Sequence, residues 1–370
     1  MTLLSPACTV AERGSIMYMA RRPRVSSAPR PSTLVGWRGR TASRRGHHRH
    51  VCPSPARSCF RSPKPTFEPS MPSRRAILIS LAVAAVALVL GAVLFVLSGR
   101  APGFTLLHLP VRTPVAVEHY GPAPLQIGEL RVPDGKGPFP LAIVIHGGCY
   151  LAGYEDLRFT APLASSLTAR GIATWNIDYR ALGDPGGGWP GTFADLANAT
   201  AYVRKFAGRY RLDLDRVAIV GHSAGAHAAL WLASRSRGAR APFADIPTLP
   251  VRYAVAIDGP PDLAKMIGTD ERICERPVVV PLMGGTPASH PERYLEITPA
   301  RHLPLGVAQL LVPTQVLRLD TAIAYRDAAG ASGDRAEVLP LRMGHFDMLD
   351  PRGAGWKSIE DRIAAALAVP

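Results

Sequence analysis

Residues 216–233 read RVAIVGHSAGAHAALWLA. Val217–Val220 is continuously apolar, as buried strands are, and Ala224–Arg235 has the composition and length of a helix. The turn between them, GHSAG (221–225), places glycines around a serine, and glycine leaves room in a tight turn beside a strained residue. This strand–turn–helix setting predicts that Ser223 is a nucleophile presented at the end of a strand.

A second motif, HGGC (146–149), follows the apolar run Leu141–Ile145. Glycines after a strand allow backbone N–H groups to approach a negatively charged oxygen closely. We therefore predict an oxyanion hole formed by the N–H groups of Gly148, Cys149 and Ala224. His146 itself is predicted to be a structural hydrogen-bonding residue.

A third motif, GHFD (344–347), follows the strand-like run Glu337–Leu341 and precedes the helical segment Trp356–Leu367. A histidine in such a late loop can fold back over the serine and act as its general base. We predict this role for His345. Asp347 is interpreted as a cap of the loop.

The rest of the domain, residues 115–370, alternates strands and helices, which predicts an α/β fold with a mostly parallel sheet covered on both faces. Val115–Val132 is expected to form an antiparallel hairpin at the edge, and the proline-rich segments Ala241–Pro250 and Pro260–Leu305 a small cap. The expected buried strands are Leu141–Ile145, Ile172–Ile177, Val217–Val220 and Tyr253–Ile257, and the expected helices are Tyr154–Arg170, Phe193–Arg209 and Ala224–Arg235.

Five segments together resemble bacterial α/β-hydrolases of the feruloyl-esterase-like and kynurenine-formamidase-like group: HGGCY, NIDYR, PGGGWPGTFAD, GHSAGAHAALWLA and GHFDMLDP. The resemblance covers roughly residues 125–365. It implies that Asp178 and Arg180 are mostly structural.

The expected reaction is the hydrolysis of small-molecule carboxylic esters through an acyl-enzyme. An amidase or arylformamidase with the same machinery is the alternative. No cofactor or metal is expected, because none of the steps requires one.

The acid that orients the histidine is the weak point of the resemblance. Such enzymes carry an H-G-x-x-D-x-x-V-P stretch after the seventh strand, whereas residues 307–325 read VAQLLVPTQVLRLDTAIAY. Asp320 is the first candidate, provided that Gln315–Leu319 is the strand, and Asp258 and Asp262 are held in reserve. If none serves, the chain is a catalytically impaired, membrane-tethered protein of the same fold.

The positive charge of the chain lies almost entirely in residues 1–75, which hold 15 Lys and Arg against two Glu. The remaining residues hold 28 Lys and Arg against 26 Asp and Glu, so the folded part is nearly neutral. We interpret residues 1–75 as a disordered basic tail and hypothesise that translation starts near Met71. Nucleic-acid binding would depend on this tail alone and is not expected.

Residues 76–97 contain no charged side chain and are long enough to span a bilayer. We expect an uncleaved signal anchor in the cell membrane, with the basic N-terminus inside, residues 98–114 as a linker and the catalytic domain on the extracytoplasmic side. Cys149 and Cys274 are the two cysteines of the domain. They are either free thiols or one disulfide, depending on the compartment.

Overall fold

The computed structural model describes residues 73–97, 106–238 and 240–368. Most of the expected disordered tail, residues 1–75, and the start at Met71 lie outside the described residues. The same holds for residues 98–105 of the expected linker. The end of the expectation for the tail is wrong, because Arg74 and Arg75 form the start of a helix.

One mixed sheet of eight strands organises the described part of the chain, in the order β1-β2-β4-β3-β5-β6-β7-β8. β1 and β2 pair antiparallel, β2 pairs antiparallel with β4, and the other strands are parallel. The predicted fold class and edge hairpin are therefore confirmed. The strands are β1 Ala116–His119, β2 Ile127–Arg131, β3 Phe139–Ile145, β4 Ala173–Ile177, β5 Leu212–His222, β6 Tyr253–Ile257, β7 Ala308–Val312 and β8 Ala336–Val338.

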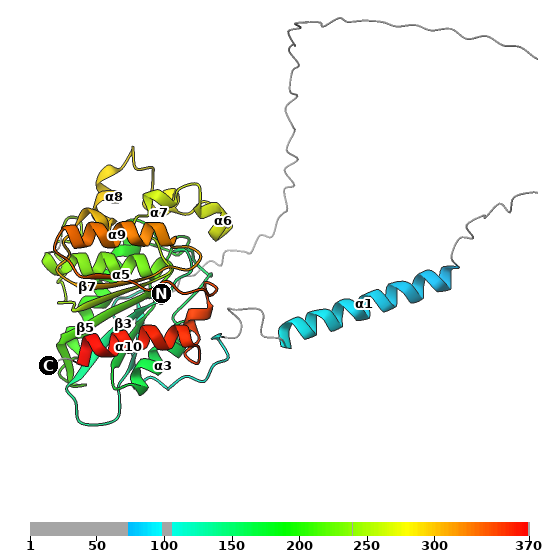
Figure 1. Ribbon diagram of the computed structural model, residues 1–370, viewed down its shortest axis with the longest axis horizontal. Helices are drawn as coiled ribbons and strands as arrows, with labels where there is room; N and C mark the ends of the chain where they lie inside the picture. The colour runs from blue at the N-terminus through cyan, green and yellow to red at the C-terminus, as the bar shows by residue number, and fades with distance from the viewer. Residues whose placement is uncertain (1–72, 98–105, 239, 369–370) are drawn as a thin grey trace, which may run out of the picture. The chain divides into compact units, whose positions relative to one another are not determined.

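Helices cover both faces of this sheet, α5 and α9 on one side and α3 and α10 on the other (Figure 1). Alternate strand residues separate two cores: Ile143 packs in the core that includes Trp231 of α5, and Val144 in the core that includes Trp356 of α10. The larger helices are α3 Ala161–Ala169, α4 Gly191–Tyr202, α5 Ala224–Ser234, α9 Leu319–Ala331 and α10 Ala354–Ala368. Short 3₁₀ turns are η1 Val203–Lys205, η2 Arg235–Arg237 and η5 Asp347–Leu349.

Several predicted boundaries differ from the structure. The helix expected at Phe193–Arg209 is α4, which ends at Tyr202 and is followed by η1. The helix expected from Tyr154 begins at Ala161, where Pro162 in the first turn supplies the fixed φ of a helix start. The strand expected at Gln315–Leu319 is wrong, because β7 ends at Val312 and α9 starts at Leu319. The strand expected at Glu337–Leu341 is the shorter β8.

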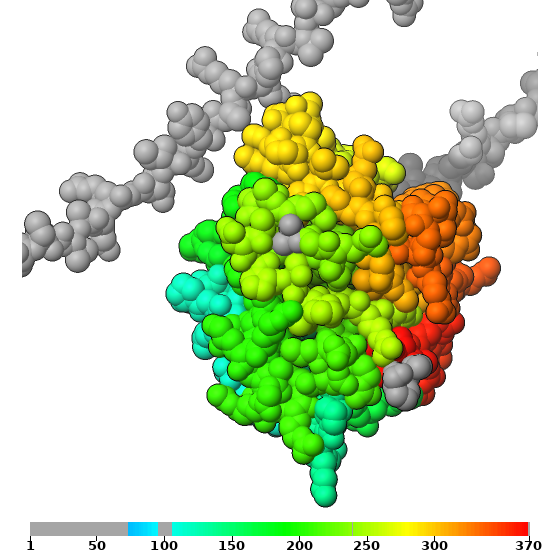
Figure 2. All heavy atoms as spheres, turned by 90° about the vertical axis from the view of Figure 1, so that its left-hand side faces the viewer, coloured from blue at the N-terminus to red at the C-terminus, as the bar shows by residue number. Residues whose placement is uncertain are grey.

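The predicted cap segment between β6 and β7 consists of short helices, and Figure 2 shows part of it (yellow) at one end of the domain. They are η3 Ala264–Met266, α6 Asp270–Cys274, α7 Val279–Met283, α8 Pro291–Ile297 and η4 Pro299–Arg301. A disulfide joins Cys149, in the loop after β3, to Cys274 at the end of α6, with the Cα atoms 6.0 Å apart. The alternative left open for these cysteines is thereby decided in favour of the bridge, which ties the cap to the HGGC loop.

Residues 74–97 form one continuous helix, α1 (Arg74–Leu97). Its 24 residues extend about 36 Å at about 1.5 Å per residue, which exceeds the roughly 30 Å thickness of the hydrocarbon core. By length and composition the helix can cross a membrane.

Candidate active site

Ser223 lies at the bend between β5 and α5, in a conformation that side chains rarely adopt: φ is 55° and ψ is −117°. The glycines of the motif make this bend possible. A methyl group on Gly221 would lie 1.9 Å from the carbonyl oxygen of Gly225, and one on Gly225 would lie 2.3 Å from that of Ile145. The Ser223 N–H donates to the carbonyl of Ile257 at 2.8 Å, which fixes the bend to β6. The predicted geometry around the serine is present.

Asp258, which follows β6, is the carboxylate that contacts His345. Its Oδ2 lies 2.6 Å from Nδ1 of His345. The carboxylate also accepts the backbone N–H groups of residues 314–317 at 2.9–3.2 Å. Burial alone would raise the pKa of Asp258, but the hydrogen bonds from His345 and from this loop bring it well below its usual range. Asp258 is therefore an anion at neutral pH.

The prediction that Asp320 orients the histidine is wrong. Asp320 lies in the first turn of α9, its side chain is 64% exposed, and it pairs with Arg318 at 2.7 Å. The error came from placing a strand at Gln315–Leu319. The loop there bends back so that its N–H groups surround Asp258 instead. Asp262, the other reserve candidate, accepts the N–H of Ala264.

His345 is held at the bend by the residue that precedes the serine. Nε2–H of His222 donates to the carbonyl oxygen of His345 at 2.9 Å, and the two imidazole rings lie 4.4 Å apart. Burial, with repulsion from His345, lowers the pKa of His222 to about 3, so His222 is neutral near pH 7. No role was predicted for His222 from the sequence. Its position next to Ser223 inside the GHSAG motif was the signal that could have indicated one.

Serine, imidazole and carboxylate thus converge on the carboxyl ends of the strands. Gly259, next to Asp258, lies so close that a methyl group on it would be 1.9 Å from the Ser223 carbonyl oxygen. Among the described residues no hydrogen bond joins Ser223 Oγ to His345. In serine hydrolases without substrate this contact is often loose and tightens in the complex.

The HGGC loop lies against the serine in an unusual backbone conformation. Gly148, Cys149 and Tyr150 have φ values of 84°, 57° and 56°. A methyl group on Gly147 would lie 2.9 Å from Cβ of Ser223. Within residues 106–238 and 240–368, the N–H groups of Cys149 and Ala224 have no hydrogen-bond acceptor, as an oxyanion hole requires.

Glu155 is a neighbour of this loop that sequence reasoning missed, because no motif marks it. Its Oε2 accepts the N–H of Gly147 at 3.2 Å. Burial raises the pKa of Glu155; His146, His345 and the N–H groups of Gly147 and Gly148 partly oppose the rise. Of the predicted oxyanion donors, Gly148 therefore faces a carboxyl group, while Cys149 and Ala224 do not.

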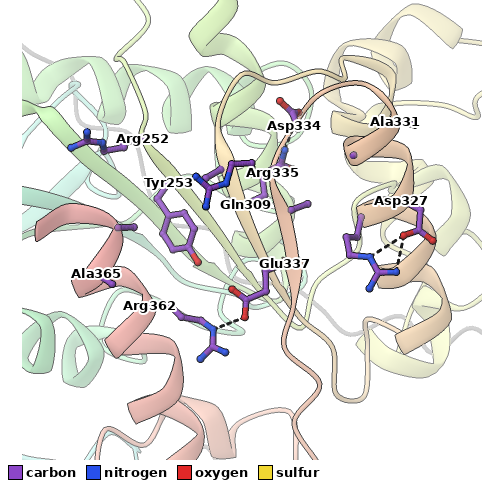
Figure 3. A pocket seen from close by; sticks show the side chains of 15 residues that line it. Arg252, Tyr253, Gln309, Asp327, Ala331, Asp334, Arg335, Glu337, Arg362 and Ala365 are labelled. Carbon is purple, nitrogen blue, oxygen red and sulfur yellow. Dashed lines mark hydrogen bonds and ion pairs between the residues drawn. The ribbon is translucent and has the colours of Figure 1, made fainter. Parts of the chain in front are cut away.

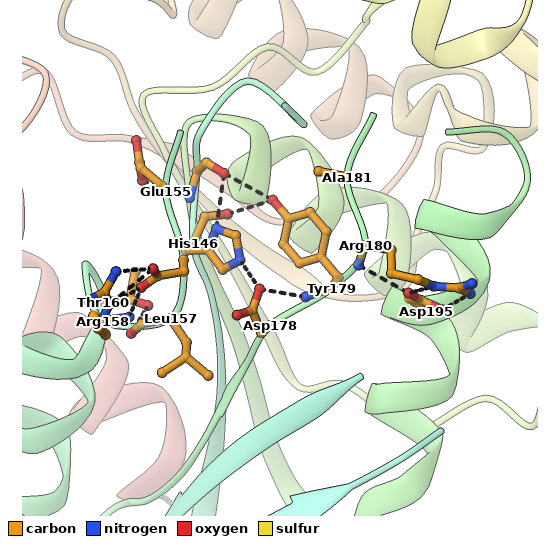
Figure 4. Close-up of polar contacts among 12 residues, drawn as sticks. His146, Glu155, Leu157, Arg158, Thr160, Asp178, Tyr179, Arg180, Ala181 and Asp195 are labelled. Carbon is orange, nitrogen blue, oxygen red and sulfur yellow. Dashed lines mark hydrogen bonds and ion pairs between the residues drawn. The ribbon is translucent and has the colours of Figure 1, made fainter. Parts of the chain in front are cut away.

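A buried polar network supports the loop from behind (Figure 4). His146 Nε2 lies 3.1 Å from Asp178 Oδ1, and the Tyr179 hydroxyl donates to the carbonyls of His146 and Gly147 at 3.1 and 3.0 Å. Burial lowers the pKa of His146, but Asp178, together with Glu155 and the Gly147 carbonyl, more than offsets this, so that the pKa is raised. The structural roles predicted for His146 and Asp178 are confirmed.

Two further residues that were predicted to be structural also make polar contacts that fit such a role. Arg180 forms a bidentate pair with Asp195, with both N–O distances 2.7 Å (Figure 4). Asp347 accepts the N–H of Gly344 at 2.7 Å and so caps the loop that carries His345.

A large hollow of about 1030 Å³ lies away from these residues (Figure 3). It is lined by Tyr253, Ala308 and Ala336, the first residues of β6, β7 and β8. It therefore opens at the amino ends of the strands, whereas ligands of open α/β sheets bind at the carboxyl ends. The cavity that borders Ser223 is a different and much smaller one, of about 50 Å³.

Residues 130–312, which span the serine, the HGGC loop and Asp258, match the model of the BD-FAE family of α/β-hydrolases. The chain is an α/β-hydrolase. A truncated carbohydrate esterase from gut microbiota has a similar structure, with a TM-score of 0.57 and 18% identity over 70% of this chain and 98% of that one. Esterase 2 of Thermogutta terrifontis, phosphoramylated by tabun, gives a TM-score of 0.53 and 16% identity over 68% and 93%.

Curated proteins similar to this α/β-hydrolase are named as esterases. A probable isoprenylcysteine alpha-carbonyl methylesterase of Oryza sativa subsp. japonica is 33% identical over 30% of this chain and 26% of its own length. The probable carboxylic ester hydrolase LipM of Mycobacterium tuberculosis is 25% identical over 61% and 54%. The chain thus spans about a quarter of the length of the plant methylesterases that it matches.

Proposed function

We propose that this α/β-hydrolase cleaves carboxylic esters through an acyl-enzyme on Ser223. The single observation that carries the proposal is the 2.6 Å contact between His345 Nδ1 and the buried Asp258 carboxylate, beside a strained serine. An anionic Asp258 keeps the proton of His345 on Nδ1. Nε2 is then left unprotonated and able to accept a proton from Ser223.

In the first half-reaction, Ser223 Oγ attacks the ester carbonyl carbon while its proton moves to Nε2 of His345. The carbonyl oxygen becomes an oxyanion that accepts hydrogen bonds from the N–H groups of Cys149 and Ala224. The N–H of Gly148, the third predicted donor, lies close enough to the Glu155 carboxyl group to lower its pKa. Collapse of the intermediate breaks the ester C–O bond, and His345 returns the proton to the departing alcohol.

In the second half-reaction, water attacks the acyl group on Ser223 and gives a proton to His345. The intermediate collapses to a carboxylic acid, and the proton restores the Ser223 hydroxyl. Asp258 stays ionised throughout. Its part is to orient the imidazole and to stabilise the positive charge that His345 carries in each intermediate.

A fluorophosphonate probe and p-nitrophenyl acetate test this mechanism on the full-length chain. We expect labelling and turnover, both lost in Ser223→Ala, which removes the nucleophile but little volume. Unchanged labelling in Ser223→Ala would overturn the assignment. Faster turnover of N-formylkynurenine than of p-nitrophenyl acetate would point to the amidase alternative instead.

We further propose that α1 anchors the hydrolase in the cell membrane, with the domain on the extracytoplasmic side. The uncharged residues 76–97 of α1 and the positive residues before them, which include Arg74 and Arg75 in its first turn, support this orientation. The Cys149–Cys274 disulfide supports it as well, because such bonds persist in oxidising compartments.

Protease added to intact cells tests the orientation. We expect digestion of the domain without lysis, whereas a cytoplasmic marker protein stays intact. Protection of the domain until the membrane is disrupted would place it on the other side.

A further inference from the structure

The small cavity beside Ser223 has walls from two parts of the chain. Ser223, Ala224 and Cys149 form one end, which is the end where the ester carbonyl would lie. The remaining wall is mostly apolar and comes largely from the cap: Leu263, Met266, Ile273, Cys274, Val279 and Leu282. Met266 and Ile273 are partly buried, and Leu282 is 1% exposed.

The position of the cavity shows which half of an ester it can hold. His345 must protonate the departing alcohol, so the alcohol has to leave on the side of the imidazole. Neither His345 nor His222 lines the cavity, whereas Ala224 and Cys149 do. The cavity is therefore on the acyl side of the scissile bond.

The cap wall is held in place by contacts that leave it little freedom to retreat. The disulfide ties Cys274 to the HGGC loop. The buried Asp270 carboxylate accepts the N–H groups of Val278 and Val279, each at 2.9 Å. The carbonyl of Leu282 accepts the N–H of Trp189 at 2.7 Å. A larger acyl group would have to break some of these bonds.

We propose that the hydrolase accepts short, unbranched, apolar acyl groups of about two to four carbons, which are acetyl to butyryl esters. The proposal rests on the ester hydrolysis proposed above. The cavity volume is about 50 Å³, and one water occupies about 10–15 Å³ on this measure, so that three to five water-sized groups fit. Hexanoyl and phenylpropenoyl groups exceed this volume, and the alcohol half remains unrestricted by the cavity.

The test compares kcat/KM of the full-length protein for p-nitrophenyl acetate, butyrate and hexanoate. We expect hexanoate to be at least about tenfold worse than butyrate, the scale set by a methylene that a pocket cannot accommodate. Ile273→Ala and Leu282→Ala enlarge the cavity and should each raise the hexanoate-to-butyrate ratio about tenfold. Val279→Phe fills part of it and should lower butyrate turnover about tenfold more than acetate turnover.

Ile323→Ala is the matched control, because Ile323 lies on α9 and does not line the cavity. Its chain-length profile should equal that of the native protein. Ile273 is only partly buried, so Ile273→Ala remains informative if Leu282→Ala fails to fold.

Fluorophosphonate labelling of Ser223 in every variant separates the two proposals. Labelled protein that hydrolyses hexanoate as well as butyrate, or labelled cavity variants with an unchanged profile, would overturn the acyl-size inference alone. Absence of both labelling and turnover would overturn ester hydrolysis, and with it the inference.

Discussion

At the scale of single residues, Asp258 contacts two separate parts of the site. No sequence motif indicated this double role. Asp258 binds His345 and also the N–H groups of residues 314–317, so one carboxylate holds both the imidazole and the loop after β7. The sequence was sufficient to select Ser223 and His345 as candidates, because each lies in a motif. Asp258 could be named only as a reserve candidate, because its partner loop has no side-chain signature: the donors are backbone N–H groups.

Replacing the acid should slow the reaction severely. Asp258→Asn should lower kcat about 10⁴-fold, because an amide can favour the wrong tautomer of His345. Asp320→Asn is the matched control and should have native activity, since Asp320 pairs with Arg318 on the surface. Initial rates with p-nitrophenyl acetate measure both. Equal losses in the two variants would contradict the assignment.

The stability contributed by Asp258 should depend on pH. Its pKa is lower in the folded chain than the value of about 3.9 in an unfolded one. Its stabilisation is therefore complete above pH 5 and is lost as the pH falls through the folded pKa. The difference in Tm between the native chain and Asp258→Asn should be larger at pH 7 than at pH 3. Thermal unfolding followed by circular dichroism measures it, and a difference independent of pH would contradict the shifted pKa.

Glu155 should act on stability in the opposite direction. Its pKa is raised, so the folded chain favours the protonated form and is penalised as the pH rises above about 4.3, the unfolded value. Glu155→Gln keeps an acceptor for the Gly147 N–H without the charge. We expect a higher Tm than the native chain at pH 8 and an equal Tm at pH 4. A lower Tm of the variant at pH 8 would show that the carboxylate is needed.

At the scale of elements, the β5–turn–α5 unit shows how local sequence determines local structure. This unit was predicted from the apolar run Val217–Val220, the glycines of GHSAG and the helical composition of the residues that follow. The predicted helix ended at Arg235, and α5 ends at Ser234. The seventh strand was misplaced because two strand-like segments, Val307–Val312 and Gln315–Leu319, follow one another. Pairing with β6 selects the first segment, and pairing between distant strands cannot be read from either segment alone.

Two glycine-to-alanine substitutions distinguish the effect of close packing on stability from the effect of helix propensity. Gly225→Ala should destabilise the fold by about 1–3 kcal/mol, because the new methyl group would meet the Ile145 carbonyl oxygen. Gly330→Ala on the exposed side of α9 meets no atom within 4 Å and should stabilise by about 0.5–1 kcal/mol. Urea titration of both variants measures these free energies. Equal effects of the two substitutions would contradict the close approach at the bend.

At the scale of the whole molecule, residue counts predicted a charged tail, a spanning segment and a nearly neutral domain. The disulfide could not be derived, because two cysteines 125 residues apart pair only if the cap folds over the HGGC loop. The cap helices were also unpredictable: each has five to seven residues, too few for a periodic pattern.

Membrane anchoring through α1 can be tested by introducing one charged residue into the helix. The native chain should resist extraction with alkaline carbonate, whereas Leu88→Arg near the middle of α1 should be partly released. An arginine there opposes insertion by about 2.5–3.5 kcal/mol. Leu88→Ile should behave like the native chain. Release of the native chain itself would contradict the anchor.

The sheet of the described chain ends in two very short edge strands, β1 with four residues and β8 with three. Such edges offer a neighbouring polypeptide few unpaired backbone groups, and β1 and β8 each carry a glutamate. Copies of the hydrolase that are crowded on one membrane would therefore gain little free energy from pairing their edge strands. High local density should leave them as separate molecules rather than seed aggregates.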